Sequence, residues 1–87
     1  LQSIYKIEWL PKAFRQLKKI TDKKSKNAVL DTVDTLEKWP DFHNIKALKG
    51  RVGYRKRAGN WRIIFDVTNQ LKIIEIQEVK KRDKNTY

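Results

Sequence analysis

The feature that most constrains this chain is a short motif near its middle, where Gly59-Asn60 separates two runs rich in aromatic, β-branched and basic residues. Gly at the first central position of a two-residue loop supplies the positive φ that the turn requires, so residues 54–67 predict a β-hairpin. This loop also fixes which residues face each other across the hairpin. The expected pairs are Ala58 with Trp61, Arg57 with Arg62, Lys56 with Ile63, Arg55 with Ile64, and Tyr54 with Phe65.

Side chains alternate between the two faces of a strand, and this alternation divides the hairpin into a basic and an apolar face. Arg55, Arg57 and Arg62 share the basic face. The other face is apolar except for Lys56, which we interpret as belonging to an edge strand, with its ammonium reaching water. Guanidinium groups on one face repel each other, so we expect an anionic ligand there. Because they bind phosphate through paired hydrogen bonds, the expected ligand is a nucleic-acid backbone. The alternative is a solvated strand face that is basic only because the chain is rich in Lys and Arg.

Composition and charge bound the class of protein. The 87 residues allow one domain, residues 1–87, with a small core. The net charge of +11 points to a polyanionic partner. Residues 46–87 hold twelve Lys and Arg against four Asp and Glu, a net of +8, whereas residues 1–45 hold nine against six, a net of +3. With no Cys and no apolar run near the ~20 residues that span a bilayer, we expect a soluble cytoplasmic protein without a membrane partner.

The remaining sequence predicts an α+β fold with the order β-α-α-β-β-β. The expected elements are a strand over 4–9, a helix over 11–20, a second helix that Thr21 or Asp22 caps and Pro40 ends, an ordered loop over 41–53, the hairpin, a turn at 68–70 and a strand over 71–80. Because strands joined by tight turns are antiparallel, we expect an antiparallel sheet with a helical hairpin packed on one face. The opposite face is then left open.

The residue types exclude several chemistries. Cys is absent and the single His43 has no second His at metal-binding spacing, so we predict no metal and no cofactor. Neither a glycine-rich phosphate loop nor a Ser-His-Asp set is present. RNA can be cleaved without a metal because its 2′-OH is a nucleophile of its own. The residues suited to this reaction are Arg55, Arg57, Arg62, Arg82 and Tyr87. Further cations expected to bind RNA are Lys46, Lys49, Arg51, Lys56, Lys81 and Lys84.

The element order and four short motifs resemble the RelE branch of the RelE/ParE toxin superfamily. The motifs are Leu48-Lys49-Gly50, the basic strand from Tyr54 to Arg57, Trp61-Arg62, and the tail from Lys81-Arg82 to Tyr87. This resemblance implies a bacterial or archaeal type II toxin, an endoribonuclease that enters the ribosomal A site and cuts translated mRNA by 2′-OH attack. It also implies a cognate antitoxin protein that covers the active site. Operator DNA is an expected partner only of the toxin–antitoxin complex.

The resemblance also implies a role for each residue of the site. Arg55 and Arg57 fall where the family has two basic strand residues for proton transfer and phosphate stabilisation, and Arg62 matches a phosphate-binding Arg. Arg82 matches an Arg proposed as general acid or transition-state stabiliser, and Tyr87 a Tyr that stacks on and orients the substrate. The best-known member has Lys at the first two positions. Arg stays protonated at any accessible pH and is a poor general base, so the identity of the general base stays open while the electrostatic role of these residues is kept.

Two other functions remain open at this point. A ParE-type toxin has the same fold and inhibits DNA gyrase without cleaving RNA. The retained Arg and Tyr set argues against it, because a gyrase inhibitor has no need of these residues. The second alternative is a non-catalytic nucleic-acid-binding module whose basic face only follows phosphates.

Overall fold

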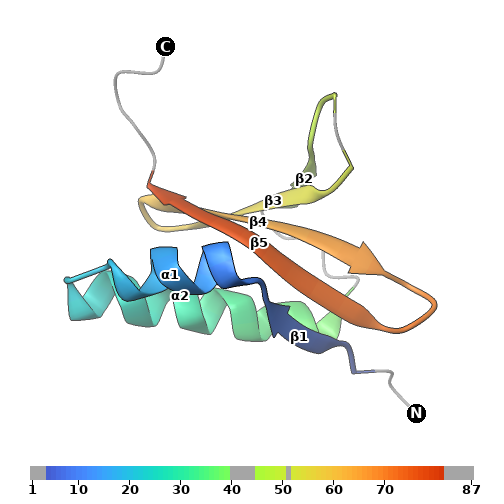
Figure 1. The fold of residues 1–87 in the computed structure, drawn as a ribbon, viewed down its shortest axis with the longest axis horizontal. Coiled ribbons are helices and arrows are strands. Elements are labelled where there is room, and N and C mark those ends of the chain that lie inside the picture. The colour runs from blue at the N-terminus through green and yellow to red at the C-terminus, as the bar shows by residue number, and fades with distance from the viewer. Residues whose placement is uncertain (1–3, 40–44, 51, 82–87) are drawn as a thin grey trace.

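A single five-stranded sheet carries two helices on one of its faces (Figure 1). The computed structural model describes residues 4–39, 45–50 and 52–81. In chain order the elements are β1 (Lys6–Trp9), α1 (Pro11–Lys18), α2 (Lys23–Thr35), the 3₁₀ helix η1 (Leu36–Lys38), β2 (Ile45–Ala47), β3 (Tyr54–Ala58), β4 (Trp61–Thr68) and β5 (Ile73–Lys81). The α+β class and the placement of both helices on one face are as predicted.

The strand order is β1-β5-β4-β3-β2, so the first strand of the chain pairs with the last. The pairs β2–β3, β3–β4 and β4–β5 are antiparallel, which agrees with the prediction. The β1–β5 pair is parallel, so the sheet is mostly antiparallel, with this one pair as the exception to the predicted antiparallel sheet. A tight turn forces its two strands to be antiparallel, whereas β1 reaches β5 only after both helices and three other strands, which leaves its direction free.

The stretch expected to be a loop over 41–53 contains a short strand. Within it, β2 pairs with β3 and sets Lys46 directly opposite Arg55. The N–H of Leu48 then donates to the carbonyl of Gly53 at 3.0 Å, which closes the turn that follows. Three residues are too few to show a two-residue period, so the sequence pattern does not reveal this strand. Its effect is to make β2, rather than β3, the edge of the sheet.

The central hairpin is confirmed pair by pair. All five expected pairs occur in the register of β3 and β4, from Ala58 opposite Trp61 to Tyr54 opposite Phe65. Gly59 has a φ of +62°, the left-handed conformation that the two-residue loop requires. The local turn therefore fixes which side chains share each face of these two strands.

The helices begin where the sequence predicts. Pro11 is the first residue of α1, and Asp22 caps α2 by accepting hydrogen bonds from the N–H of Lys24 at 3.2 Å and the hydroxyl of Ser25 at 2.7 Å. The bond from Ser25, followed by that from Lys24, lowers the pKa of Asp22. Of the two expected caps, Asp22 is thus the one used. The first helix ends at Lys18, two residues before the expected end at Ile20.

The core lies between the helices and the inner face of the sheet. Phe65 of β4 is fully buried at its centre, together with Val29 and Val33 of α2. The Trp39 ring lies 5.8 Å from that of Phe65 in an edge-to-face arrangement and 5.0 Å from that of Tyr54. These rings attach the end of the helical layer to the central hairpin. The opposite face of β3 and β4 therefore carries the side chains that the core does not use.

Candidate nucleic-acid interface

Three arginines lie on the face of the sheet away from the helices. Arg57 of β3 is directly opposite Arg62 of β4, and Arg55 is directly opposite Ile64. Their neighbours Ile63 and Phe65 are fully buried on the helical side, which fixes the direction of the arginines by alternation. Arg57 is exposed, and Arg55 and Arg62 are half-buried. The predicted basic face is therefore present on β3 and β4.

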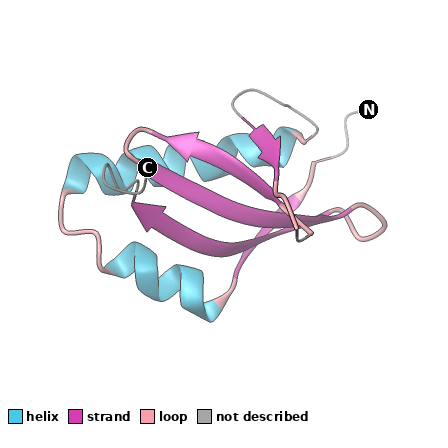
Figure 2. Cartoon of the chain, turned by 90° about the horizontal axis from the view of Figure 1, so that it is seen from above, coloured by secondary structure: helices cyan, strands magenta, loops and turns pink. Residues whose placement is uncertain are grey.

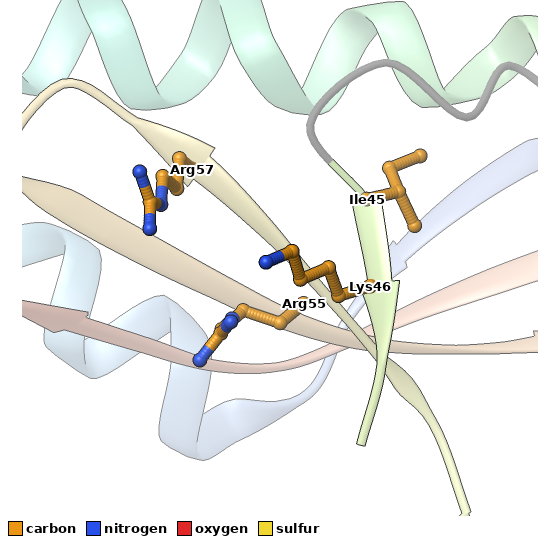
Figure 3. Close-up of a pocket in the computed structure, with 4 residues that line it drawn as sticks. All are labelled: Ile45, Lys46, Arg55 and Arg57. Atoms are coloured by element: carbon orange, nitrogen blue, oxygen red, sulfur yellow. The ribbon is translucent and has the colours of Figure 1, made fainter.

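A pocket of about 390 Å³ lies beside these arginines, lined by residues of the paired strands β2 and β3. It is lined by Ile45, Lys46, Arg55 and Arg57 (Figure 3). Three of the four lining side chains are cationic, and Lys46 is placed there by its pairing with Arg55. A pocket with this lining favours an anion, and guanidinium groups match phosphate in particular.

The basic face continues onto β5 through a residue that the sequence prediction missed. Lys80 lies directly opposite Arg62, so Arg57, Arg62 and Lys80 form one row across three neighbouring strands. Lys81, which we expected to bind RNA, is opposite Trp61 and so falls on the other face by register. A bulge in β5 at Gln77, opposite the step from Ile64 to Phe65 in β4, causes this exchange. The signal in the sequence is the spacing of the buried residues Ile74, Ile76 and Val79, which breaks a two-residue period.

The other half of the open face carries three carboxylates, with Lys6 of β1 as a cation beside them. The register places Glu8 of β1 beside Glu75 of β5, and Glu75 beside Asp66 of β4. These three carboxylates form a row that runs parallel to the row of cations. A polyanion is attracted to the half of the face that holds Arg57 and Arg62 and repelled by the half that holds Glu75.

Glu78 is a carboxylate within the basic half of the face. Its pairing with Ile64 places it on the open side, and it is only 7% exposed. Its Oε1 lies 3.0 Å from Nζ of Lys12 and 3.4 Å from Nζ of Lys80. The hydrogen bond from Lys12, aided by the charge of Lys80, holds the pKa of Glu78 below its ordinary value, although burial acts in the opposite direction. Glu78 therefore stays ionised at neutral pH.

The lowered pKa of Glu78 has a testable effect on stability. A carboxyl group whose pKa is lower in the folded state stabilises the fold above its unfolded pKa, and this contribution is lost as the pH falls through the folded pKa. We expect the free energy of unfolding of Glu78→Gln to decline less steeply than that of the wild type as the pH falls below the ordinary value of 4.5. Urea unfolding at a series of acidic pH values measures this. Glu37→Gln, at an exposed glutamate, is the matched control, and identical curves for Glu78→Gln and the wild type would contradict the expectation.

Lys56 does not join the basic face. We expected an edge residue with its ammonium in water, but β2 covers that edge, and Lys56 is 7% exposed. Its Nζ donates to the Thr35 hydroxyl at 2.8 Å, on the helical side of the sheet. The prediction that Lys56 binds RNA therefore loses its geometric basis.

Replacing Lys56 with Met is expected to stabilise the protein. A buried ammonium has three donor hydrogens, and one of them is donated to the hydroxyl of Thr35. That hydroxyl itself donates to the carbonyl of Thr32, a hydrogen bond that does not depend on Lys56. We expect the free energy of unfolding to rise by about 1 kcal/mol in urea titrations, because a flexible apolar chain removes the cost of burying a charge. Lys23→Met, at an exposed lysine, should change it little. A destabilised Lys56→Met protein would show that the hydrogen bond outweighs the burial cost.

The other predicted residues divide into two groups. Lys49 is exposed in the turn after β2 and does not line the pocket. Arg51, Lys84, Arg82 and Tyr87 lie outside the described residues. Within residues 4–39, 45–50 and 52–81, no three His, Asp or Glu side chains are grouped so that they could hold a metal ion. In the same ranges, no helix is long and apolar enough to cross a membrane.

Residues 7–86 match the model of the family described as the ParE toxin of the type II toxin–antitoxin system, parDE. The chain belongs to this toxin family. The chain therefore also belongs to the wider RelE/ParE toxin superfamily, but the family that matches is ParE and not the RelE branch that the sequence resemblance implied. A comparison with curated protein sequences finds no match.

Solved structures of RelE and ParE toxins share the fold of this toxin. The RelBE2 toxin–antitoxin complex from Mycobacterium tuberculosis has a TM-score of 0.81 at 20% identity, covering 94% of this chain and 95% of that one. The archaeal RelE–RelB complex from Pyrococcus horikoshii OT3 has a TM-score of 0.78 at 25% identity, with 93% and 98% covered. The ParDE system from P. aeruginosa has a TM-score of 0.76 at 15% identity, with 94% and 100% covered. Both branches of the superfamily are therefore among its structural relatives.

Proposed function

We propose that this toxin is a ribosome-dependent endoribonuclease that cleaves mRNA in the A site and thereby stops translation and growth. The observation that carries the proposal is the gathering of Arg55, Arg57, Arg62 and Lys46 on a sheet face that the helices leave open. Gathering like charges on one face is unfavourable for folding, and a ligand of opposite charge would offset that cost. Single-stranded RNA supplies both the phosphates and a nucleophile.

The proposed reaction is attack of the 2′-oxygen on the neighbouring phosphorus. A bond forms between the 2′-oxygen and phosphorus, and the bond from phosphorus to the 5′-oxygen breaks. The 2′-hydroxyl loses its proton, and the departing 5′-oxygen gains one. Arg57 and Arg62 are paired directly opposite each other on the adjacent strands β3 and β4. They are therefore suited to stabilising the extra negative charge of the phosphorane. The pocket beside Arg55 would hold an adjacent phosphate.

Proton transfer is assigned by resemblance. Arg82 would act as general acid or stabilise the transition state, and Tyr87 would stack on and orient the RNA. Both lie outside the described residues. Arginine stays protonated at any accessible pH and is therefore a poor general base, so Arg55 and Arg57 act in this proposal through their charge.

The partners follow from the same proposal. Similar structures include a RelBE toxin–antitoxin complex and an archaeal RelE–RelB complex, which supports a cognate antitoxin for this chain. We expect that antitoxin to cover the basic face and the pair to bind operator DNA as a complex. Action on ribosomes would place the toxin in the cytoplasm.

The chemistry is tested by the ends of the cleaved RNA. Attack by the 2′-oxygen leaves a 2′,3′-cyclic phosphate on the upstream fragment and a 5′-hydroxyl on the downstream one. Fragments produced on translating ribosomes are therefore treated with a kinase that labels 5′-hydroxyl ends, with and without prior phosphatase treatment. Labelling that does not need the phosphatase supports the proposal. Ends that carry a 5′-phosphate would indicate attack by water and would refute the proposed mechanism.

Gyrase inhibition is a second candidate because the matching family model is described as a ParE toxin. It is tested with purified DNA gyrase and relaxed plasmid, by adding the toxin and following supercoiling. A gyrase inhibitor would block supercoiling and leave mRNA on ribosomes intact. The proposed nuclease would do the reverse.

A further inference from the structure

We propose that Lys80 contacts the RNA backbone and that Glu78 is the residue that positions it, with Lys12 as the anchor of Glu78. This inference rests on the proposed nuclease function and adds a residue that the resemblance does not supply. It is carried by the bulge in β5, by the contacts between α1 and this bulge, and by the ion pairs of Glu78.

The bulge in β5 is what brings Lys80 to the open face. Ile74 and Ile76 are fully buried, so strict alternation would turn residues 78 and 80 into the core. Instead, Ile64 pairs with Glu78 while Phe65 pairs with Ile76, which leaves Gln77 as the extra residue. Val79 then enters the core at 2% exposure, and Lys80 faces the open side opposite Arg62. The one-residue shift in register thus moves residue 80 from the core side of the sheet to the open face, beside the arginines.

Helix α1 holds the bulged segment from the side. Strand β1 ends at Trp9, so the following part of β5 would be an unpaired sheet edge. The N–H of Leu10 donates to the carbonyl of Ile76 at 3.0 Å, and the N–H of Val79 donates to Oε1 of Gln16 at 2.7 Å. Figure 2 shows the shorter helix, α1, running beside this part of the sheet. The register that places Lys80 is therefore fixed by the helix as well as by β4.

Glu78 links this anchored segment to Lys80. The same carboxylate oxygen accepts from Lys12 of α1 at 3.0 Å and lies 3.4 Å from Nζ of Lys80. The side chain of Glu78 is 9% exposed whereas that of Lys80 is 55% exposed, so a buried carboxylate restrains an ammonium that solvent can still reach. A lysine held in this way loses less rotamer freedom when it meets a phosphate.

Together these contacts complete a row of three cations. Neighbouring strands are about 4.8 Å apart, so Arg57, Arg62 and Lys80 span roughly 10 Å across the sheet. The acidic row that contains Glu75 and Asp66 crosses the sheet four residues further along β4 than Arg62, and it repels phosphate. We infer that the RNA backbone crosses the strands along the cationic row, with Lys80 on the phosphate next to that held by Arg62.

The test counts ionic contacts to RNA. A short labelled 2′-O-methyl RNA, which has no free 2′-OH and is not cleaved, is titrated with the purified toxin at several salt concentrations. Lys80→Ala is expected to lower the slope of log affinity against log salt by about 0.7, which is about a fivefold loss at ~0.1 M salt. Lys23→Ala removes the same charge from the exposed start of α2 and should leave the slope unchanged. An unchanged slope in Lys80→Ala would overturn the contact.

The positioning role of Glu78 is tested by a double-mutant cycle. If Glu78 holds Lys80, the affinity loss caused by Lys80→Ala should shrink about twofold in a Glu78→Gln background. Lys12→Gln, at an exposed residue, breaks the same anchor from the other side and should have the same effect. A full Lys80→Ala loss in both backgrounds would overturn the positioning role. The proposed function fails separately, if the wild-type toxin leaves mRNA on ribosomes intact.

Discussion

Arg62→Ala is expected to abolish growth arrest while leaving the fold intact. Arg62 lies on the open face at the centre of the cationic row, opposite both Arg57 and Lys80. Removing one preorganised charge donor from a transition state costs about 10²- to 10³-fold in rate, which is enough to make a growth inhibitor harmless. The rate of mRNA cleavage on ribosomes and the survival of cells expressing each variant measure this.

Two further variants serve as controls for the Arg62→Ala experiment. Arg15→Ala removes an exposed arginine from α1, an element that contributes no residue to the cationic row, and should retain growth arrest. Arg62→Lys keeps the charge but loses the bidentate hydrogen bonding to phosphate, so we expect a rate of mRNA cleavage between those of the wild type and Arg62→Ala. Full toxicity of a folded Arg62→Ala protein would remove Arg62 from the proposed active site.

Phe65→Ala is expected to destabilise the protein severely. Phe65 is fully buried and contacts the rings of Trp39 and Tyr54. Truncating a buried Phe to Ala typically costs about 3–5 kcal/mol, a large part of the total stability of a domain of this size. Urea unfolding should show a much lower midpoint, with toxicity lost through unfolding.

The matched control for Phe65→Ala is Leu71→Ala, because Leu71 is 69% exposed in the turn between β4 and β5. Its free energy of unfolding should stay within about 0.5 kcal/mol of the wild type. If the urea midpoint of Phe65→Ala equalled that of the wild type, the hairpin would not be the centre of the core.

The central hairpin could be predicted because its information is local. Gly59 fixes the turn, the turn fixes the register, and alternation then assigns Arg55, Arg57 and Arg62 to one face. The helix starts at Pro11 and after Asp22 are local signals of the same kind. These parts of the fold, and the placement of the three arginines on one face, were correctly predicted from the sequence.

The parts that were missed depend on contacts between distant segments. The parallel pairing of β1 with β5 and the short strand β2 are set by the assembled sheet, so no local pattern specifies them. Because β2 covers the edge of β3, Lys56 turns to Thr35 rather than to water. Lys80 was missed because the spacing of Ile74, Ile76 and Val79 indicates only that β5 is irregular, whereas the position of the bulge depends on packing against β4 and α1.

The most direct test of the nuclease proposal is primer extension on an mRNA in programmed ribosomes, with the same mRNA free in solution beside it. Wild-type toxin is added to both, and Arg62→Ala serves as the inactive control. The proposal requires new 3′ ends within the A-site codon in the ribosome-bound mRNA and none in the free mRNA. Intact mRNA in both samples, with folded wild-type toxin, would contradict it and direct attention to gyrase and then to binding alone.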